Sequence, residues 1–198
     1  MSEVRYWVAL ILICLIPGTI AYWFSIHPFI GFWRRFSVVF TMAVHGVLIV
    51  MIAAFVASQR KWMLSIEFGN QIALALAGVA LLVVAGVLRR KVGSELRIAT
   101  LLGFPELAPY RGDQPLLTGG LYSTIRHPRY VQLLIALWGW TLLANYLALY
   151  VMSVLTMAAL HALVLLEERE LCDRYGRAYS EYAQRVPRFV PRLSRRRP

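Results

Sequence analysis

GLYSTIRHPRY, residues 120–130, leads into a long apolar run, VQLLIALWGWTLLANYLALYVMSVLTMAALHALVLL, residues 131–166, and Glu167-Glu168 follow directly. The run contains no Lys, Arg, Asp or Glu. It is too long for a single membrane span, because about 20 residues cross the ~30 Å of hydrocarbon in a bilayer. It fits a helical hairpin that turns near Asn145-Tyr146 and returns the chain to the side it left. The sequence therefore predicts that the polar clusters at the two ends of the run meet at one membrane face.

The composition of the chain indicates an integral membrane protein. Hydrophobic residues make up 59% of the 198 residues, and the mean hydropathy is +0.60. The net charge of +11 would indicate nucleic acid in a soluble protein, but here it fits membrane topology better. Eighteen of the 21 Lys and Arg residues lie in residues 33–35, 89–129 and 169–197, which the positive-inside rule places on the cytoplasmic side. We therefore expect a lipid bilayer, and no nucleic acid, as partner.

Three further apolar segments precede the hairpin. We expect membrane spans over residues 6–24, 36–57 and 72–88, with a kink in the first at Pro17-Gly18. Together with the hairpin they predict an all-α integral membrane protein of about five transmembrane helices, whose N-terminus lies outside.

Single residues within these spans carry further expectations. Gly78 and Gly86, in the third span, allow close contact with another helix. His45, in the second, is expected to be a packed histidine bonded to a neighbouring helix. An ionisable group inside a span is nevertheless also a functional candidate.

The chain is expected to form one membrane domain, residues 1–198. Residues 1–91 hold the three N-terminal spans, and residues 92–198 hold a loop, the hairpin and a C-terminal helix that together form the catalytic half. Residues 94–104 could form a short helix on the membrane surface. Beyond the hairpin, one stripe at helical spacing predicts an amphipathic cytoplasmic helix ending before Pro187. The stripe consists of Glu168, Cys172, Tyr175, Tyr179 and Tyr182.

Two motifs at the ends of the hairpin carry a resemblance. The first is LYSTIRHPRY, residues 121–130, and the second runs from Glu167-Glu168 through Tyr175-Gly176, Tyr179 and Tyr182 to Val186-Pro187. Over about residues 114–191 the chain resembles the isoprenylcysteine carboxyl methyltransferase family, of which phospholipid methyltransferases are close relatives. The resemblance implies a membrane enzyme that transfers a methyl group from S-adenosylmethionine to a lipophilic or small acceptor. Its active site and C-terminus are expected on the cytoplasmic face.

The resemblance also implies a site. The positions that match cofactor contacts of the family are Gln114, Pro115, Leu116, Leu117, Tyr122, His127, Pro128, Arg129, Tyr130 and Glu167. Arg126 matches a residue needed for activity, and with Glu167 and Glu168 it makes up the candidate catalytic set.

The chemistry of these residues agrees with that role. Aromatic faces and carboxylates suit a sulfonium ion, and helix N-termini with nearby cations suit a carboxylate. Because a carboxylate among aromatic residues is costly without a partner, Glu168 is expected to pair with Arg126 or His127. Its role is then to orient its partners rather than to act as a base.

Two positions depart from the family pattern. Prenylcysteine enzymes typically carry an Arg, which serves the substrate carboxylate, where this chain has Leu163, and this counts against a prenylated protein as acceptor. Gln132 stands where the family usually has Gly, and it could narrow or redirect the acceptor tunnel. The reactive group of the acceptor, whether a carboxylate, amine, thiol or hydroxyl, stays open.

Other classes of protein are weighed by their motifs. No Cys/His spacing typical of zinc is present, so no metal is expected. The lack of a Gly-x-Gly-x-x-Gly sequence excludes a soluble Rossmann-type methyltransferase. One alternative is an NADPH-dependent reductase related to sterol and steroid reductases, which resemble the hairpin and its Arg-His-Pro-x-Tyr motif. The other is a non-enzymatic membrane scaffold whose basic tail binds anionic lipid.

Overall fold

The computed structural model describes residues 2–93 and 115–192, and within them the regular secondary structure is helical apart from one isolated bridge between Glu67 and Tyr146. Gln114 and the surface helix expected over residues 94–104 lie outside these ranges. The described helices are, in chain order, α1 (Ser2–Ile26), α2 (Ile30–Trp33), α3 (Val38–Ser58), α4 (Arg60–Met63), α5 (Ile72–Gly93), the 3₁₀ turn η1 (Gly120–Ser123), α8 (Pro128–Ala144), α9 (Leu147–Tyr175) and α10 (Arg177–Arg185).

Four helices are long and apolar enough to cross a bilayer: Glu3–Ile26, Val38–Ser58, Ile72–Gly93 and Leu147–Tyr175. They confirm the three expected N-terminal spans and the second arm of the hairpin. The first arm, α8, has 17 residues and is therefore about 26 Å long, slightly less than the ~30 Å hydrocarbon core. The protein is a multi-pass, all-α membrane protein as predicted, and the expected fifth span is this shorter helix.

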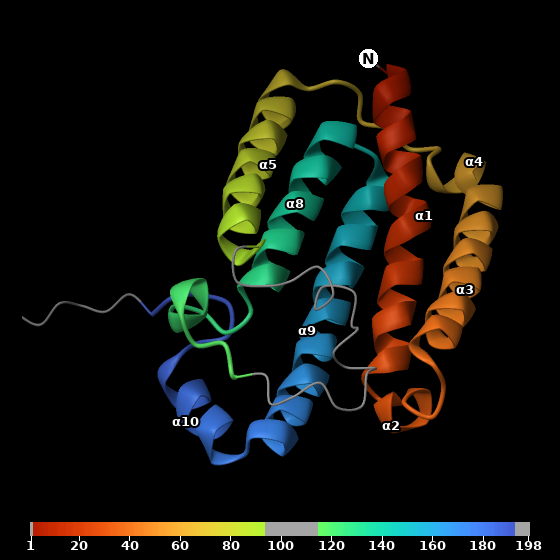
Figure 1. Cartoon of the computed structure of the whole chain (residues 1–198). Coiled ribbons are helices and arrows are strands. Elements are labelled where there is room, and N and C mark those ends of the chain that lie inside the picture. Colours follow the sequence, from red (N-terminus) through yellow and green to blue (C-terminus); the bar gives the residue numbers. More distant parts are fainter. Residues whose placement is uncertain (1, 94–114, 193–198) are drawn as a thin grey trace, which may run out of the picture.

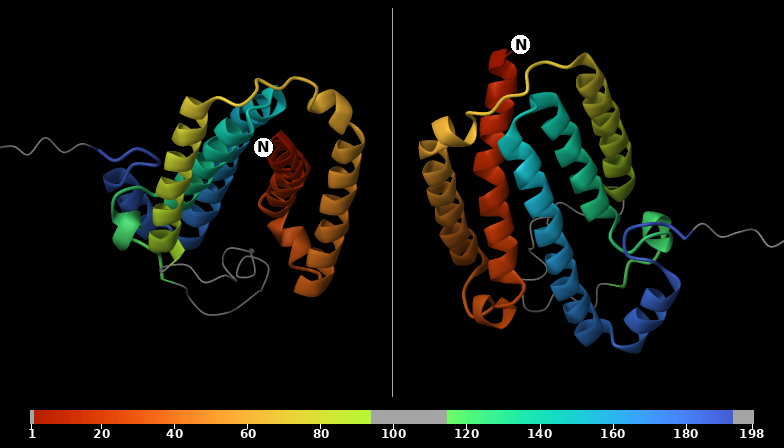
Figure 2. Two further views of the ribbon diagram at one scale, coloured as in Figure 1. Left: turned by 90° about the horizontal axis from the view of Figure 1, so that it is seen from above. Right: turned by 180° about the vertical axis from the view of Figure 1, so that it is seen from behind.

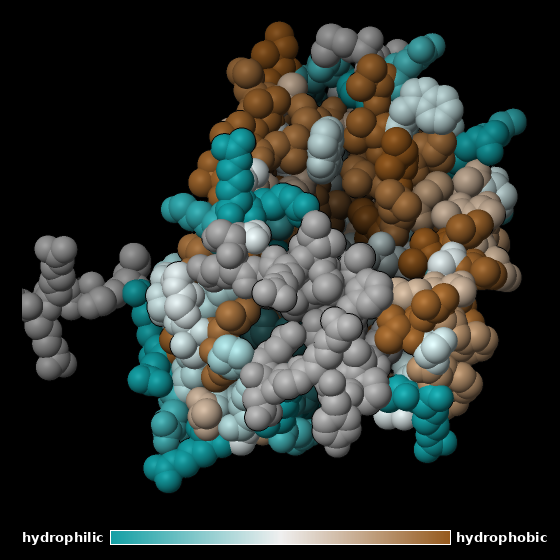
Figure 3. Space-filling model, in the orientation of Figure 1, coloured by the Kyte–Doolittle hydropathy of each residue, from teal (hydrophilic) through white to brown (hydrophobic). Residues whose placement is uncertain are grey.

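The spatial order of the long helices differs from their order in the chain. In Figure 1, α5, α8, α9, α1 and α3 follow one another across the bundle, and the two views in Figure 2 agree. The most extensive packing joins α5 to α8, while α3 packs mainly on α1. Hydrophobic residues dominate the upper part of the molecule in Figure 3, whereas hydrophilic residues gather around its lower end, where α10 lies. The fold therefore has one distinctly polar end.

Gly78 is the contact point between α5 and α8. A Cβ atom at this position would lie 2.7 Å from the Gly139 carbonyl oxygen and 2.9 Å from Cγ of Leu143. The predicted close helix contact is thus confirmed at Gly78. It is wrong at Gly86, where no described atom lies within 4 Å of the corresponding Cβ position. Gly86 lies on a side of α5 that α8 does not cover.

We expect Gly78→Ala to lower the midpoint of thermal unfolding in detergent, because the new methyl group meets backbone that cannot move aside cheaply. Overpacking of this kind costs about 1–3 kcal/mol. Gly86→Ala is the matched control, since it adds the same methyl group to the same helix in open space and should be neutral or slightly stabilising. Equal midpoints for the two variants would contradict the tight α5–α8 contact.

The α8–α9 hairpin turns at Asn145, as predicted. Asn145 adopts the left-handed conformation with φ of 59°, which Asn tolerates better than most residues. Its backbone N–H donates to the Thr141 carbonyl at 2.8 Å, and its side-chain amide donates to the Gly69 carbonyl at 3.0 Å. Tyr150 donates its hydroxyl to the amide oxygen at 2.8 Å. The turn is therefore fixed by a residue suited to its backbone and by bonds from both sides.

Arg5, at the start of α1, binds the same turn. Its guanidinium donates to the Ala144 carbonyl at 2.9 and 3.0 Å and forms an ion pair with Glu67 at 2.8 Å. Arg5 is buried, so these contacts satisfy a charge that burial would otherwise make costly. They tie the first helix to the apolar hairpin at the end of the bundle opposite α10.

His45 joins α3 to α1. Its Nδ1 lies 2.7 Å from the Thr41 carbonyl and its Nε2 lies 3.1 Å from the Ser25 hydroxyl of α1. His45 is buried, and both ring nitrogens have partners. The expectation of a packed histidine bonded to a neighbouring helix is confirmed.

The helix beyond the hairpin is interrupted at Gly176, so the prediction of one continuous amphipathic helix is wrong. Gly176 has φ of +54°, a conformation that glycine adopts without a Cβ clash, and it separates α9 from α10. Tyr179 and Tyr182 are buried after this turn, whereas Cys172 is exposed before it. The expected stripe is thus two separate faces. Figure 1 shows that the turn directs α10 back beneath η1.

Candidate active site

Glu168 lies near the polar end of α9. It follows Leu147, the first residue of the helix, by 21 positions, which corresponds to about 32 Å of rise. That distance is close to the thickness of the hydrocarbon core, so Glu168 reaches the membrane face while the preceding residues cross the bilayer. The first residue of α8, Pro128, begins beside it, because the hairpin returns there.

Three basic side chains surround the Glu168 carboxylate. Its Oε1 accepts from Nε2 of His127 at 3.1 Å and lies 3.1 Å from Nη2 of Arg126. Arg188 binds both oxygens, with Nη2 at 2.7 Å from Oε2 and Nε at 3.0 Å from each. The residue is only 9% exposed. The expectation that Glu168 pairs with Arg126 or His127 is confirmed for both, and we call these four residues the Glu168 cluster.

Arg188 is the member that sequence reasoning missed. It lies on the segment after α10, whose carbonyls accept from the turn before α8: the Arg126 N–H bonds to Pro187 at 2.8 Å and the His127 N–H bonds to Arg188 at 3.1 Å. The hydrogen bonds with Glu168 raise the pKa of the Arg188 guanidinium still further. The only signal in the sequence was its place directly after the Val186-Pro187 motif.

Glu167 differs from Glu168 in having few contacts. Its Oε2 is buried without a hydrogen bond among the described residues, and Nδ1 of His127 lies 3.7 Å away. Within the same part of the chain, Nε of Arg126 and the Tyr179 hydroxyl are also buried without hydrogen bonds. Burial raises the pKa of Tyr179, so its hydroxyl keeps its proton and can donate. One anionic acceptor and two donors are thus available at the edge of the Glu168 cluster.

Aromatic rings frame these atoms. The rings of Tyr130 and Phe189 lie 5.8 and 6.0 Å from that of His127. Tyr182 donates its hydroxyl to the Tyr122 carbonyl at 2.6 Å, and burial raises the pKa of Tyr182 to about 12. The site is therefore a polar cluster set in an aromatic surround, with α10 closing one side.

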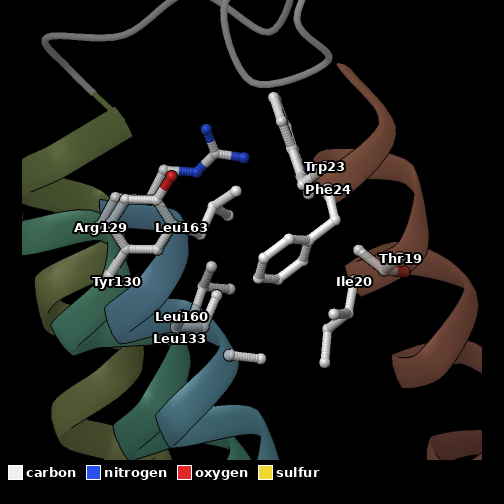
Figure 4. Close-up of a pocket in the computed structure, with 10 residues that line it drawn as sticks. Thr19, Ile20, Trp23, Phe24, Arg129, Tyr130, Leu133, Leu160 and Leu163 are labelled. Atoms are coloured by element: carbon white, nitrogen blue, oxygen red, sulfur yellow. The ribbon is translucent and has the colours of Figure 1, made fainter. Parts of the chain in front are cut away.

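An apolar pocket adjoins the cluster between α1 and the hairpin (Figure 4). It is a small cavity of about 60 Å³. Its lining consists of Thr19, Ile20, Trp23 and Phe24 from α1, Arg129, Tyr130 and Leu133 from α8, and Ala159, Leu160 and Leu163 from α9.

Two links connect this pocket to the polar cluster. Tyr130 lines the pocket and also lies beside His127. Leu163 lines it from α9, and Glu167 follows one helical turn later and so lies on the same side of the helix. Sequence reasoning did not assign α1 to the site. Directly after α1, Nδ1 of His27 lies 3.0 Å from Oε2 of Glu170 on α9, within hydrogen-bonding distance, and this contact joins the two helices.

The other residues predicted to contact the cofactor lie in different environments, some exposed and some buried. Pro115 and Leu117 are exposed, whereas Leu116 packs against the buried cluster of Tyr179, Tyr182 and Val186. Pro128 is buried as the first residue of α8. Arg129 lies over the Trp23 ring of α1, 5.8 Å from its centre, and so faces the pocket. The structure thus brings Arg126, His127, Tyr130 and both glutamates together. It places Arg129 against the Trp23 ring at the pocket instead.

Fold and site define a multi-pass membrane protein with a buried, charge-paired site at one end of its helical hairpin. The chain belongs to the phospholipid methyltransferase family. The model of this family matches residues 73–178, which is more than half of the chain. The match includes α5, both arms of the hairpin and the Glu168 cluster except Arg188.

Individual relatives match over a shorter stretch. The cobalt-zinc-cadmium resistance protein CzcN of Cupriavidus metallidurans is 36% identical over 85 residues, 42% of this chain and 39% of the relative. Methanethiol S-methyltransferase 2 of Bradyrhizobium diazoefficiens is 33% identical over 42% of this chain and 32% of its own length. The protein-S-isoprenylcysteine O-methyltransferase of Schizosaccharomyces pombe is 32% identical over 40% and 34%. The match therefore spans about two fifths or less of each relative. No solved structure matches the chain significantly.

Proposed function

We propose that this protein is a membrane methyltransferase that transfers a methyl group from S-adenosylmethionine to a small or lipophilic acceptor. The observation that carries the proposal is the junction at Tyr130, where a buried polar cluster meets an apolar pocket within the membrane bundle. A charged cofactor and an apolar acceptor need adjoining sites of these two kinds. Membership of the phospholipid methyltransferase family supports the same reaction.

The residues present fit the cofactor. The Glu167 carboxylate, with a buried oxygen that no described residue bonds, suits the ammonium or sulfonium group of S-adenosylmethionine. The rings of Tyr130 and Phe189 suit a sulfonium by cation–π attraction. Nε of Arg126 and the Tyr179 hydroxyl are donors for the carboxylate end. The bound cofactor supplies an electrophilic methyl group, and these residues hold and orient it.

In this proposal the Glu168 cluster holds the reactants in position and does not transfer a proton. Glu168 already accepts from three basic side chains, so it fixes Arg126 and His127 and has little capacity to take a proton from an acceptor. Methyl transfer is a displacement at carbon, and holding its two reactants in line can supply much of the acceleration. We therefore assign Glu168 as a positioning residue and Glu167 as the carboxylate facing the cofactor.

Orientation in the membrane is part of the proposal. The Lys and Arg asymmetry supports a Glu168 cluster on the cytoplasmic face and an Asn145 turn outside. Cys172 is exposed near the Glu168 cluster, while Cys14 lies within the α1 span. In a Cys14→Ala background, a membrane-impermeant maleimide should label Cys172 only after cells are permeabilised. Labelling of Cys172 in intact cells would show that this face lies outside and would contradict the proposed orientation.

The proposed activity is tested by two measurements on the protein in membranes and in detergent. Isothermal titration should show binding of S-adenosylhomocysteine, and radiolabelled methyl groups from S-adenosylmethionine should enter a lipid-extractable or volatile product. Binding of NADPH without binding of S-adenosylhomocysteine would contradict the proposal and favour a reductase.

A further inference from the structure

Thr156, within the α9 span, carries a buried hydroxyl group for which the described residues offer no partner. The residue is 6% exposed, and its Oγ1 makes no hydrogen bond within residues 2–93 and 115–192. Ser153, one turn earlier, is different, because its hydroxyl lies 2.8 Å from that of Thr141 on α8. Burying a hydroxyl group without a hydrogen bond is unfavourable. The Thr156 hydroxyl therefore calls for a partner at this position.

Thr156 lies on the side of α9 that forms the pocket. It precedes Leu160 by four residues and Leu163 by seven, so the three side chains share one face of the helix. Leu160 and Leu163 line the cavity. Thr156 lies one turn further from the Glu168 cluster than Leu160 does, and its hydroxyl is thus at the inner end of the pocket.

The helix opposite this face is α1, and two contacts show which part of it lies level with Thr156. The helices α1 and α9 run in the same direction. Arg5 donates to the carbonyl of Ala144, 139 residues later, and at the other end His27 lies beside Glu170, 143 residues later. Applied to Thr156, these two offsets give residues 17 and 13. Thr156 is therefore level with residues 13–17 of α1.

This turn of α1 contains Pro17, which has no backbone N–H. In a regular helix the carbonyl of residue 13 would accept from the N–H of residue 17, so the Ile13 carbonyl lacks its usual donor. Ile13 is fully buried and belongs to the same apolar cluster as Leu149 of α9. An acceptor from α1 and a hydroxyl from α9 thus lie at the same level of the interface between the two helices.

We propose that one buried water molecule binds between the Thr156 hydroxyl and the Ile13 carbonyl, and that it fixes the direction of α1 beyond Pro17. Water can donate to the carbonyl and also bond to the hydroxyl, which no hydrocarbon group can do. This inference goes beyond the proposed methyl transfer and does not depend on it.

The water site bears on the pocket because of where α1 contributes to the lining. All of its lining residues come after Pro17, namely Thr19, Ile20, Trp23 and Phe24 (Figure 4). A change in the direction of α1 at Pro17 would move this whole wall, since a helix is rigid beyond its bend. Thr156 is thus a positioning residue for the pocket.

A double-mutant cycle tests the shared water molecule. Thr156→Val keeps the shape of the side chain and removes its hydroxyl, and it should lower the unfolding midpoint in detergent because the water loses a partner. Pro17→Ala supplies the missing N–H to the Ile13 carbonyl. If both groups hold one water molecule, Thr156→Val should lower the midpoint clearly less in the Pro17→Ala background. An unchanged or raised midpoint in Thr156→Val, or equal effects in both backgrounds, would overturn the inference.

Thr41→Val is the matched control for this cycle. Thr41 lies on α3, and its Oγ1 is likewise buried without a hydrogen bond in the part of the chain that the structure describes. Gly18 packs against Ile49 of α3, and Thr41 precedes Ile49 by eight residues, about 12 Å along the helix. Because Thr41 is remote from Pro17, its substitution should change the midpoint equally in both backgrounds.

Two further measurements examine the water and the wall separately. A structure at a resolution that shows ordered water should place an oxygen within hydrogen-bonding distance of Thr156 Oγ1 and the Ile13 carbonyl, and Thr156→Val should remove it. A Thr156 hydroxyl bonded to its own helix, with no such oxygen, would overturn the site. The emission of Trp23, taken as the difference from Trp23→Phe, should shift in Thr156→Val and stay unchanged in Thr41→Val. A lowered midpoint with unchanged Trp23 emission would overturn the positioning role.

Discussion

Glu168→Ala is expected to destabilise the protein and to abolish methyl transfer. The change leaves Arg126, His127 and Arg188 side by side without the carboxylate that they share. Removing one partner of a buried ion pair costs about 3–5 kcal/mol, because the remaining charge keeps its desolvation penalty and loses its attraction. Here the largest share falls on Arg126, whose side chain is 11% exposed, since Arg188, at 38%, can turn to solvent.

Thermal unfolding in detergent and limited proteolysis of the C-terminal segment measure this effect. Loss of the Arg188 contact should release the segment after α10 and make it sensitive to trypsin, and Arg188→Gln should reproduce the release with a smaller shift in midpoint. Glu181→Gln is the control, because its pair with Arg177 is exposed and such pairs contribute little. An unchanged midpoint and an intact tail in Glu168→Ala would contradict the structural role of the cluster.

Glu167→Gln is expected to lower the affinity for S-adenosylhomocysteine by about ten- to a hundredfold while leaving the unfolding midpoint unchanged. The loss corresponds to one charge-assisted contact, roughly 1.5–3 kcal/mol. Stability should not change, because Oε2 of Glu167 makes no hydrogen bond within the described residues. Titration calorimetry and thermal unfolding give the two readouts, with Glu181→Gln again as the control.

Arg126→Ala should affect both readouts. Arg126 pairs with Glu168 and donates to the Ala183 carbonyl at 3.3 Å, so its loss also removes contacts that stabilise the fold. The effects of Arg126→Ala and Glu167→Gln on cofactor affinity should be strongly non-additive in the double variant, because either loss misplaces the same ligand. Wild-type affinity in both single variants would mean that these residues do not form a cofactor site.

The helical framework was largely predictable from the sequence. A span needs about 20 apolar residues, and each of the three N-terminal segments meets that need locally. The turn at Asn145 was also accessible, since a run twice the length of a span must reverse, and Asn is suited to the left-handed conformation found there. The break at Gly176 was missed because the tyrosine stripe continues at helical spacing across it.

The pocket was not predictable, because it is built by helices distant in the chain. Trp23 and Phe24 come from the first span, while Leu160 and Leu163 come from the last. Periodicity identifies the apolar residues of each helix but does not say which helices become neighbours, and α1 lies against α9 and α8 rather than only against α3. The orientation of Arg129 toward Trp23 depends on that arrangement.

The sequence by itself determined the membrane class, the hairpin and the meeting of two polar clusters at one face, because hydrophobic length and the period of a helix are local properties. Only the tertiary structure distinguished Glu167 from its neighbour Glu168. Adjacent residues on a helix point about 100° apart, so one carboxylate binds Arg126, His127 and Arg188 while the other keeps a buried oxygen without a hydrogen bond among the described residues. Arg188 adds to this difference by binding Glu168. Its position is set by backbone hydrogen bonds between the C-terminal segment and Arg126 and His127, more than sixty residues earlier.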